Sequence, residues 1–140
     1  MAITIRNNVF ETNSSSTHSV TIKSTNKWGN ILPNSNNIII IYGDDFGWEW
    51  EKYNDAYTKA KYCAVYFKHD DTKLEELKEI ISDYTNADDV IFYVDDSYID
   101  HQSSDILDDL TMEEIKDFIF CLDSWLYLGN DNSDNLDFYK

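Results

Sequence analysis

A polar stretch near the start of the chain has side chains suited to phosphate chemistry. Residues 11–19, ETNSSSTHS, place hydroxyl groups next to one imidazole. His18 could transfer a proton near neutral pH. The hydroxyl groups of this stretch could bind a phosphate. The residues that carry them are Ser14, Ser15, Ser16 and Thr17. The other interpretation is a polar turn whose hydroxyls satisfy their own backbone. The sequence alone does not make a triad, because triads are assembled in space.

Paired carboxylates in residues 44–51, DDFGWEWE, form a second candidate site. On an extended segment Glu49 and Glu51 would point to one face, with Trp48 and Trp50 on the other. Two carboxylates held in this way could bind Mg²⁺ or Ca²⁺. The alternative is a pair of core indoles with solvent-facing carboxylates between them.

Asp100 and His101, within residues 98–103, offer two adjacent metal ligands. A metal site needs three or four ligands, and the chain has no H-x₃-H or C-x-x-C spacing to supply the others. We therefore expect neither a metal nor a cofactor.

These polar stretches together suggest one enzymatic or ligand-sequestering hypothesis, directed at phosphoesters or nucleotides. Its catalytic groups would be His18, His101 and Ser15. Its ligand would be bound by Ser14, Ser15, Ser16, Thr17, Glu49, Glu51 and Asp100. The hypothesis predicts that the stretches meet in one pocket.

The charge distribution argues for a different class of function. Eleven Lys and Arg face 27 Asp and Glu, for a net charge of −16. Residues 1–69 carry +1 and residues 70–140 carry −17. Such a field repels nucleic acids and anionic membranes and attracts cationic surfaces. We therefore expect no direct binding to nucleic acid and no membrane association.

Acidic doublets recur along the second half of the chain. A folded surface with this density of carboxylates could imitate a nucleic acid and occupy the basic groove of a protein that binds one. The alternative is that the acidity only confers solubility. The residues expected to bind such a partner are Asp88, Asp89, Asp95, Asp96, Asp108, Asp109, Glu113 and Glu114.

The position of the cysteines and the apolar runs bears on the compartment. Cys63 and Cys121 lie among apolar and aromatic neighbours, so we expect two buried free thiols in preference to a disulfide. The N-terminus lacks a basic region followed by an apolar one. The longest aliphatic run is residues 38–41, far short of the ~20 residues of a membrane span. A cytosolic protein is the expectation.

The elements that must position these residues follow from hydrophobic periodicity. Alternation and β-branched runs predict strands over residues 1–10, 18–23, 37–42 and 90–94, with a loop over 13–17. The third strand is expected to be buried on both faces. Apolar stripes predict helices over residues 56–67, 72–84 and 112–119.

Helix caps sharpen these boundaries. Asn54 or Asp55 could cap the first helix. Thr72 with Glu75, and Thr111 with Glu114, have the spacing of capping boxes for the other two. The residues from Gly129 onward are expected to form a polar tail. The order β-β-β-α-α-β-α predicts a single compact α+β domain over residues 1–140. It would have a small mixed or antiparallel sheet of about four strands, with helices packed on one face.

Several stretches together resemble a group of short proteins encoded by bacteriophages and prophages. They are residues 6–7 with 9–19 (VFETNSSSTHS), 46–51 (FGWEWE), 58–60 with Tyr62, 98–103 (YIDHQS), 117–120, 124–126 and 129–131 (GND). The resemblance implies a phage origin and the cytoplasm of an infected bacterium; it implies no activity. It favours an accessory role, such as inhibition of a defence system in the manner of an anti-CRISPR protein.

Three hypotheses therefore stand. The first is an acidic inhibitor, a binding protein in preference to an enzyme, whose partner is a host protein with a basic, nucleic-acid-binding surface. The second is the phosphoester- or nucleotide-directed protein, and the third is a structural or assembly protein. The acidic inhibitor should show a steep loss of affinity with added salt.

Overall fold

A four-stranded antiparallel sheet forms one side of the molecule. The computed structural model describes residues 2–6, 16–46, 51–99 and 106–130. The strands lie in the order β1-β2-β6-β4, and each neighbouring pair is antiparallel. Their bounds are β1 (Ala2–Arg6), β2 (Ser16–Lys23), β4 (Glu51–Tyr53) and β6 (Trp125–Asn130).

Two parallel strands, β3 (Ile38–Tyr42) and β5 (Asp89–Tyr93), form a second, separate sheet. Ile39 lies opposite Val90 and Tyr42 opposite Tyr93. Parallel neighbours cannot be joined by a tight turn and need a crossover connection. The chain between β3 and β5 contains two helices, which make this crossover.

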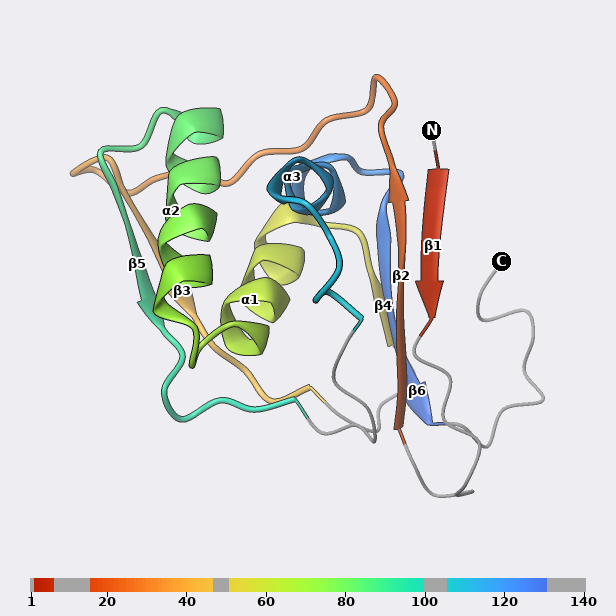
Figure 1. Cartoon of the computed structure of the whole chain (residues 1–140). Helices are drawn as coiled ribbons and strands as arrows, with labels where there is room; N and C mark the ends of the chain where they lie inside the picture. Colours follow the sequence, from red (N-terminus) through yellow and green to blue (C-terminus); the bar gives the residue numbers. More distant parts are fainter. Residues whose placement is uncertain (1, 7–15, 47–50, 100–105, 131–140) are drawn as a thin grey trace.

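The helices of the described residues, α1, α2 and α3, lie between the two sheets (Figure 1). Their bounds are α1 (Ala56–Tyr66), α2 (Asp71–Thr85) and α3 (Met112–Phe120). The helices α1 and α2 contact β3 and β5, while α3 contacts β2. The protein therefore has the predicted α+β class, with helices on one face of the antiparallel sheet. The division of the strands into two sheets was not predicted.

Local capping explains where the helices begin. Asp55 caps α1 and accepts a hydrogen bond from the Thr58 amide at 2.9 Å. The predicted capping box of Thr111 and Glu114 forms at the start of α3. The capping box predicted at Thr72 is wrong, because α2 begins earlier. The Asp70 carboxylate caps α2 and accepts from the Lys73 amide at 3.1 Å.

Two strands of the antiparallel sheet, β4 and β6, were not predicted from the sequence. β4 has only three residues, too short for an alternating pattern to be visible. β6 extends through Gly129 and Asn130, which were expected in a tail, because β2 pairs with it as far as that end. Gly and Asn are depleted in strands, so their pairing is decided by the neighbouring strand. Ser16 and Thr17, expected in a loop, are the first residues of β2 for the same reason.

The expectation that the third strand is buried on both faces is wrong. Ile39 and Ile41 are buried against the helices, whereas Ile38 and Ile40 are only half-buried and Tyr42 is exposed. A run of β-branched residues shows that a strand is apolar on both sides; it does not show that both sides are covered.

The core lies between the antiparallel sheet and the helices. Val20, Leu126 and Leu128 of the sheet are fully buried together with Ile115 and Phe118 of α3. As expected, Cys63 and Cys121 are both buried free thiols. Within the described ranges, no helix combines the length and apolar character needed to cross a membrane.

Candidate functional site

His18, the predicted proton-transfer residue, lies inside the protein. It belongs to β2 and is 1% exposed. Its Nδ1 lies 2.9 Å from the hydroxyl of Tyr62 in α1, and the two rings meet edge-on. Tyr62 is fully buried, and burial raises the pKa of its phenol well above the ordinary value. The phenol therefore stays protonated, and the pair links the sheet to α1 within the core.

Glu51 lies in the same row of the antiparallel sheet as His18. Both residues pair with Leu128, one from each side of β6. Two strand spacings separate their Cα atoms, which corresponds to about 10 Å. Side chains in one row point to the same face, yet Glu51 at the edge is exposed while His18 is buried. The structure thus brings two predicted residues to one end of the sheet, in different environments.

The remaining residues of the phosphoester hypothesis are only partly placed. Ser16 and Thr17 begin β2 at the same end of the sheet, where Ser16 pairs with Asn130. The others lie outside the described residues, and they are Ser14, Ser15, Glu49, Asp100 and His101. Their meeting in one pocket stays a prediction. In the described part of the chain, no group of three or more His, Cys, Asp or Glu residues could hold a metal ion.

The carboxylates of the described residues face solvent. None of their twenty Asp and Glu side chains is buried, and sixteen are exposed. Within the same residues three ion pairs form, Lys61–Asp44 at 3.8 Å, Lys78–Asp89 at 3.9 Å and Lys116–Glu113 at 3.1 Å. Most of these carboxylates therefore have no cation of the described residues within ion-pair distance, and their charge acts outward as a negative potential.

The eight residues predicted to bind a partner fall into two groups. Asp88 and Asp89 lie at the beginning of β5, and Asp95 and Asp96 follow its end; all four are exposed. The two doublets lie at opposite ends of β5, which is roughly 13 Å long from its first to its last Cα atom.

The second group lies around the start of α3. Asp108 and Asp109 are exposed in the turn before the helix, and Glu113 is exposed in its first turn. Three of these four acids already have structural partners, since Glu113 forms the ion pair with Lys116. Glu114 is half-buried in the capping box, and Asp108 accepts a hydrogen bond from the Tyr66 hydroxyl at 2.9 Å. The group around β5 is therefore the freer of the two.

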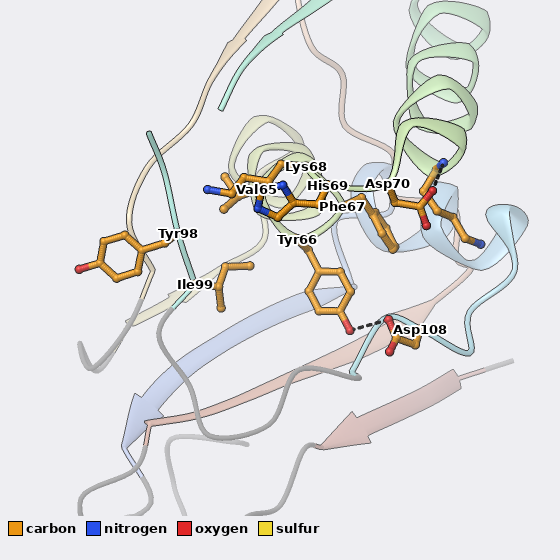
Figure 2. A pocket seen from close by; sticks show the side chains of 10 residues that line it. Val65, Tyr66, Phe67, Lys68, His69, Asp70, Tyr98, Ile99 and Asp108 are labelled. Atoms are coloured by element: carbon orange, nitrogen blue, oxygen red, sulfur yellow. Dashed lines mark hydrogen bonds between the residues drawn. The ribbon is translucent and has the colours of Figure 1, made fainter. Parts of the chain in front are cut away.

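A hollow of about 750 Å³ lies where α1 ends and α2 begins. Figure 2 shows the Tyr66 hydroxyl directed at Asp108 in its lining. Lys68 is held by the backbone carbonyls of Asp95 and Ser97. The lining also contains His69, Asp70 and Lys73, so it carries charges of both signs. The sequence indicated only a helix start here, because the lining comes from three separate segments.

Lys59 is a second buried polar residue that the sequence did not reveal. Its side chain is 0% exposed, and Nζ donates to the carbonyls of Cys121 at 2.8 Å and Ser124 at 2.9 Å. Nζ also lies 5.7 Å from the centre of the Phe118 ring. Burial lowers the pKa of Lys59 from 10.5 to about 8. These hydrogen bonds connect α1 to the turn between α3 and β6.

Comparison with protein-family models, curated proteins and solved structures finds no match to this chain.

Proposed function

We propose that this protein is an acidic inhibitor, encoded by a bacteriophage, that binds a basic surface of a host nucleic-acid-binding or defence protein. The observation that carries the proposal is the outward exposure of the carboxylates with few ion pairs among them. Unpaired surface carboxylates steer association toward a cationic surface and select against anionic partners. A groove that binds nucleic acid is such a surface, since it must replace the counterions of the phosphates.

The acidic residues that support the proposal most directly are those around β5. Asp88, Asp95 and Asp96 form no ion pair with any other described residue. Asp89 pairs with Lys78 at 3.9 Å, an exposed contact that contributes little. A basic partner therefore meets the carboxylates of Asp88, Asp95 and Asp96 without first displacing a cation of the described residues.

The test is affinity capture from a bacterial lysate, with the tagged protein as bait and mass spectrometry as the readout. At about 50 mM NaCl we expect a nucleic-acid-binding protein in stoichiometric amount, and at about 1 M NaCl we expect its release, because salt screens exposed charges. Added duplex DNA or RNA should compete for the same partner. Absence of such a protein at low salt, or capture that salt leaves unchanged, contradicts the proposal.

A matched pair of variants separates specific acids from total charge. Replacing Asp95 and Asp96 with Asn should weaken capture. Replacing Glu79 and Asp83 in α2 with Gln and Asn, an equal charge change at exposed positions, should weaken it less. Equal effects would mean that only net charge matters and that the acids around β5 have no special role.

The phosphoester-directed alternative has one observation in its favour, the shared sheet row of His18 and Glu51. The burial of His18 opposes it, because a substrate would have to reach a side chain that is 1% exposed.

A further inference from the structure

One face of the parallel pair β3–β5 is covered by no described element. Parallel strands are ordinarily covered on both faces. Here the helices pack on one face, and no described helix or strand lies on the other (Figure 1). We call this second side the outer face, and its apolar and aromatic residues are Ile38, Ile40, Tyr42, Ile91 and Tyr93.

The outer face has an apolar centre with an ordered aromatic pair. Ile40 and Ile91 lie opposite each other in the register and are half-buried. Tyr42 and Tyr93, next to them, are 57% and 56% exposed. Their rings stack at 5.5 Å between centroids with 20° between planes. Stacking in the free protein orders these rings before any partner arrives, so a partner that packs on them has little side-chain entropy to remove.

Acidic doublets surround this centre at both ends of the two strands. We call them the acidic frame, and they are Asp44, Asp45, Asp88, Asp89, Asp95 and Asp96, all exposed. Asp44–Asp45 follow β3, while the other two doublets flank β5. An apolar centre within a charged rim is the usual composition of a protein–protein interface.

The edge of β3 is less available than the outer face. The Tyr57 hydroxyl accepts from the Tyr42 amide at 3.1 Å and donates to the Ile40 carbonyl at 3.3 Å. The Ile38 backbone amide donates to Oδ1 of Asn34 at 3.0 Å, and the Asn34 backbone amide donates to the Ile38 carbonyl at 2.9 Å. These groups cannot pair with an added strand while the contacts persist, and covering an edge in this way guards against strand addition. The edge of β3 is therefore less suited to strand addition than the outer face is to contact through side chains.

From these observations we infer that the outer face binds an aromatic or aliphatic anchor on the basic partner, while Lys and Arg around that anchor meet the acidic frame. The inference rests on the proposed function and names the surface that performs it. Electrostatic repulsion disfavours a second copy of this chain as the occupant. It would bring a second acidic frame against the first, and each chain carries a net charge of −16. Exposed tyrosines at the centre of an interface are frequent energetic anchors.

The test uses two pentapeptides of equal charge, Arg-Trp-Arg-Trp-Arg and Arg-Ser-Arg-Ser-Arg, titrated into isotope-labelled protein at about 50 mM NaCl. We expect the Trp peptide to bind at least about tenfold more tightly, since it alone supplies an apolar anchor. The largest backbone shift changes should fall in residues 38–42 and 89–93. The doubly substituted Tyr42→Ala, Tyr93→Ala protein should bind both peptides with nearly equal affinity.

Two further variants complete the design. Asp95→Asn with Asp96→Asn, in the acidic frame, should weaken both peptides by a similar factor. Glu79→Gln with Asp83→Asn, exposed on α2, should leave the preference for the Trp peptide in place. Because both tyrosines are more than half exposed, their replacement should leave the unfolding transition close to that of the parent protein.

The outcomes separate the inference from the function on which it rests. Equal affinity for the two peptides, or shift changes centred on residues 108–114, overturns the inference while capture from the lysate still supports an acidic inhibitor. Salt-independent capture overturns the function, whatever the peptides do. Dimerisation seen in sedimentation experiments, and abolished by the two Tyr→Ala changes, would assign the outer face to a second copy and so overturn the basic partner.

Discussion

The buried ammonium of Lys59 should make the stability of this protein rise with pH. Its pKa falls from the ordinary 10.5 to about 8 because burial penalises the charged form. Between these values the unfolded chain binds more protons than the folded chain, so the free energy of unfolding increases with pH. Below about pH 8 both states carry the charge, and the whole penalty is present, on the order of 3 kcal/mol at about 1.4 kcal/mol per pH unit.

Lys59→Met isolates this effect, because Met approximates the shape of the side chain and does not titrate. The free energy of unfolding of the parent protein, minus that of the variant, should grow by about 1.3 kcal/mol between pH 7 and pH 9. Urea unfolding followed by tryptophan fluorescence at pH 7, 8 and 9 measures it. The thiol of Cys63, whose pKa burial raises, is present in both proteins and largely cancels.

The matched control is Lys27→Met, at an exposed position. Its difference from the parent protein should stay constant over the same pH range. A constant difference for Lys59→Met as well would refute the reasoning, because it would mean that the ammonium is hydrated in the folded state. A difference that shrinks with pH would show that an anion stabilises the charge, which also contradicts the structure.

Three further changes test contacts elsewhere in the fold by urea or thermal unfolding. Tyr62→Phe removes the hydroxyl bonded to His18 in the core and should cost about 1–2 kcal/mol; an unchanged midpoint would contradict that bond. Thr111→Ala removes the capping box of α3 and should lower the free energy of unfolding by about 1 kcal/mol. Thr72→Ala, inside the first turn of α2, should change it by less than about 0.5 kcal/mol. Equal effects of the two substitutions would show that Thr72 caps α2 after all. Gly43→Ala should lower the free energy of unfolding by about 1–3 kcal/mol, because the added Cβ would collide with the Ser97 side chain and lie 3.0 Å from the Val94 Cα. Unchanged stability would show that the chain at Gly43 and the chain at residues 94–97 move apart easily.

The features that the sequence predicted correctly depend on neighbours along the chain. The capping box of Thr111 and Glu114 joins residues three positions apart, so its pattern is visible in any context. The cap at Asp55 is local in the same way. The start of α2 was not predicted correctly, because the Asp70 carboxylate caps this helix two residues before Thr72. The exposure of seven of the eight acids in the predicted partner-binding set, all except Glu114, was also foreseeable, because charged side chains are rarely buried.

The candidate sites depended on segments that are distant in the sequence. His18 is buried because Tyr62, 44 residues away, packs against it. Lys59 is buried because the carbonyls of Cys121 and Ser124 receive its ammonium. No local signal distinguishes either residue from an exposed one of the same type.

Sequence alone thus determined the starts of α1 and α3, most of the strands, the α+β class and the acidity of the surface, since each follows from composition or from contacts within one turn or strand. Tertiary structure decided which strands pair, which polar groups are enclosed and which apolar face stays open. The run at residues 38–41 shows the division most clearly. Its β-branched residues dictate a strand, but only the placement of α1 and α2 on one side leaves Ile40 and Tyr42 on the other side, where no helix or strand of the described residues covers them. Burial is a property of what another segment covers, and that information is spread over the whole chain.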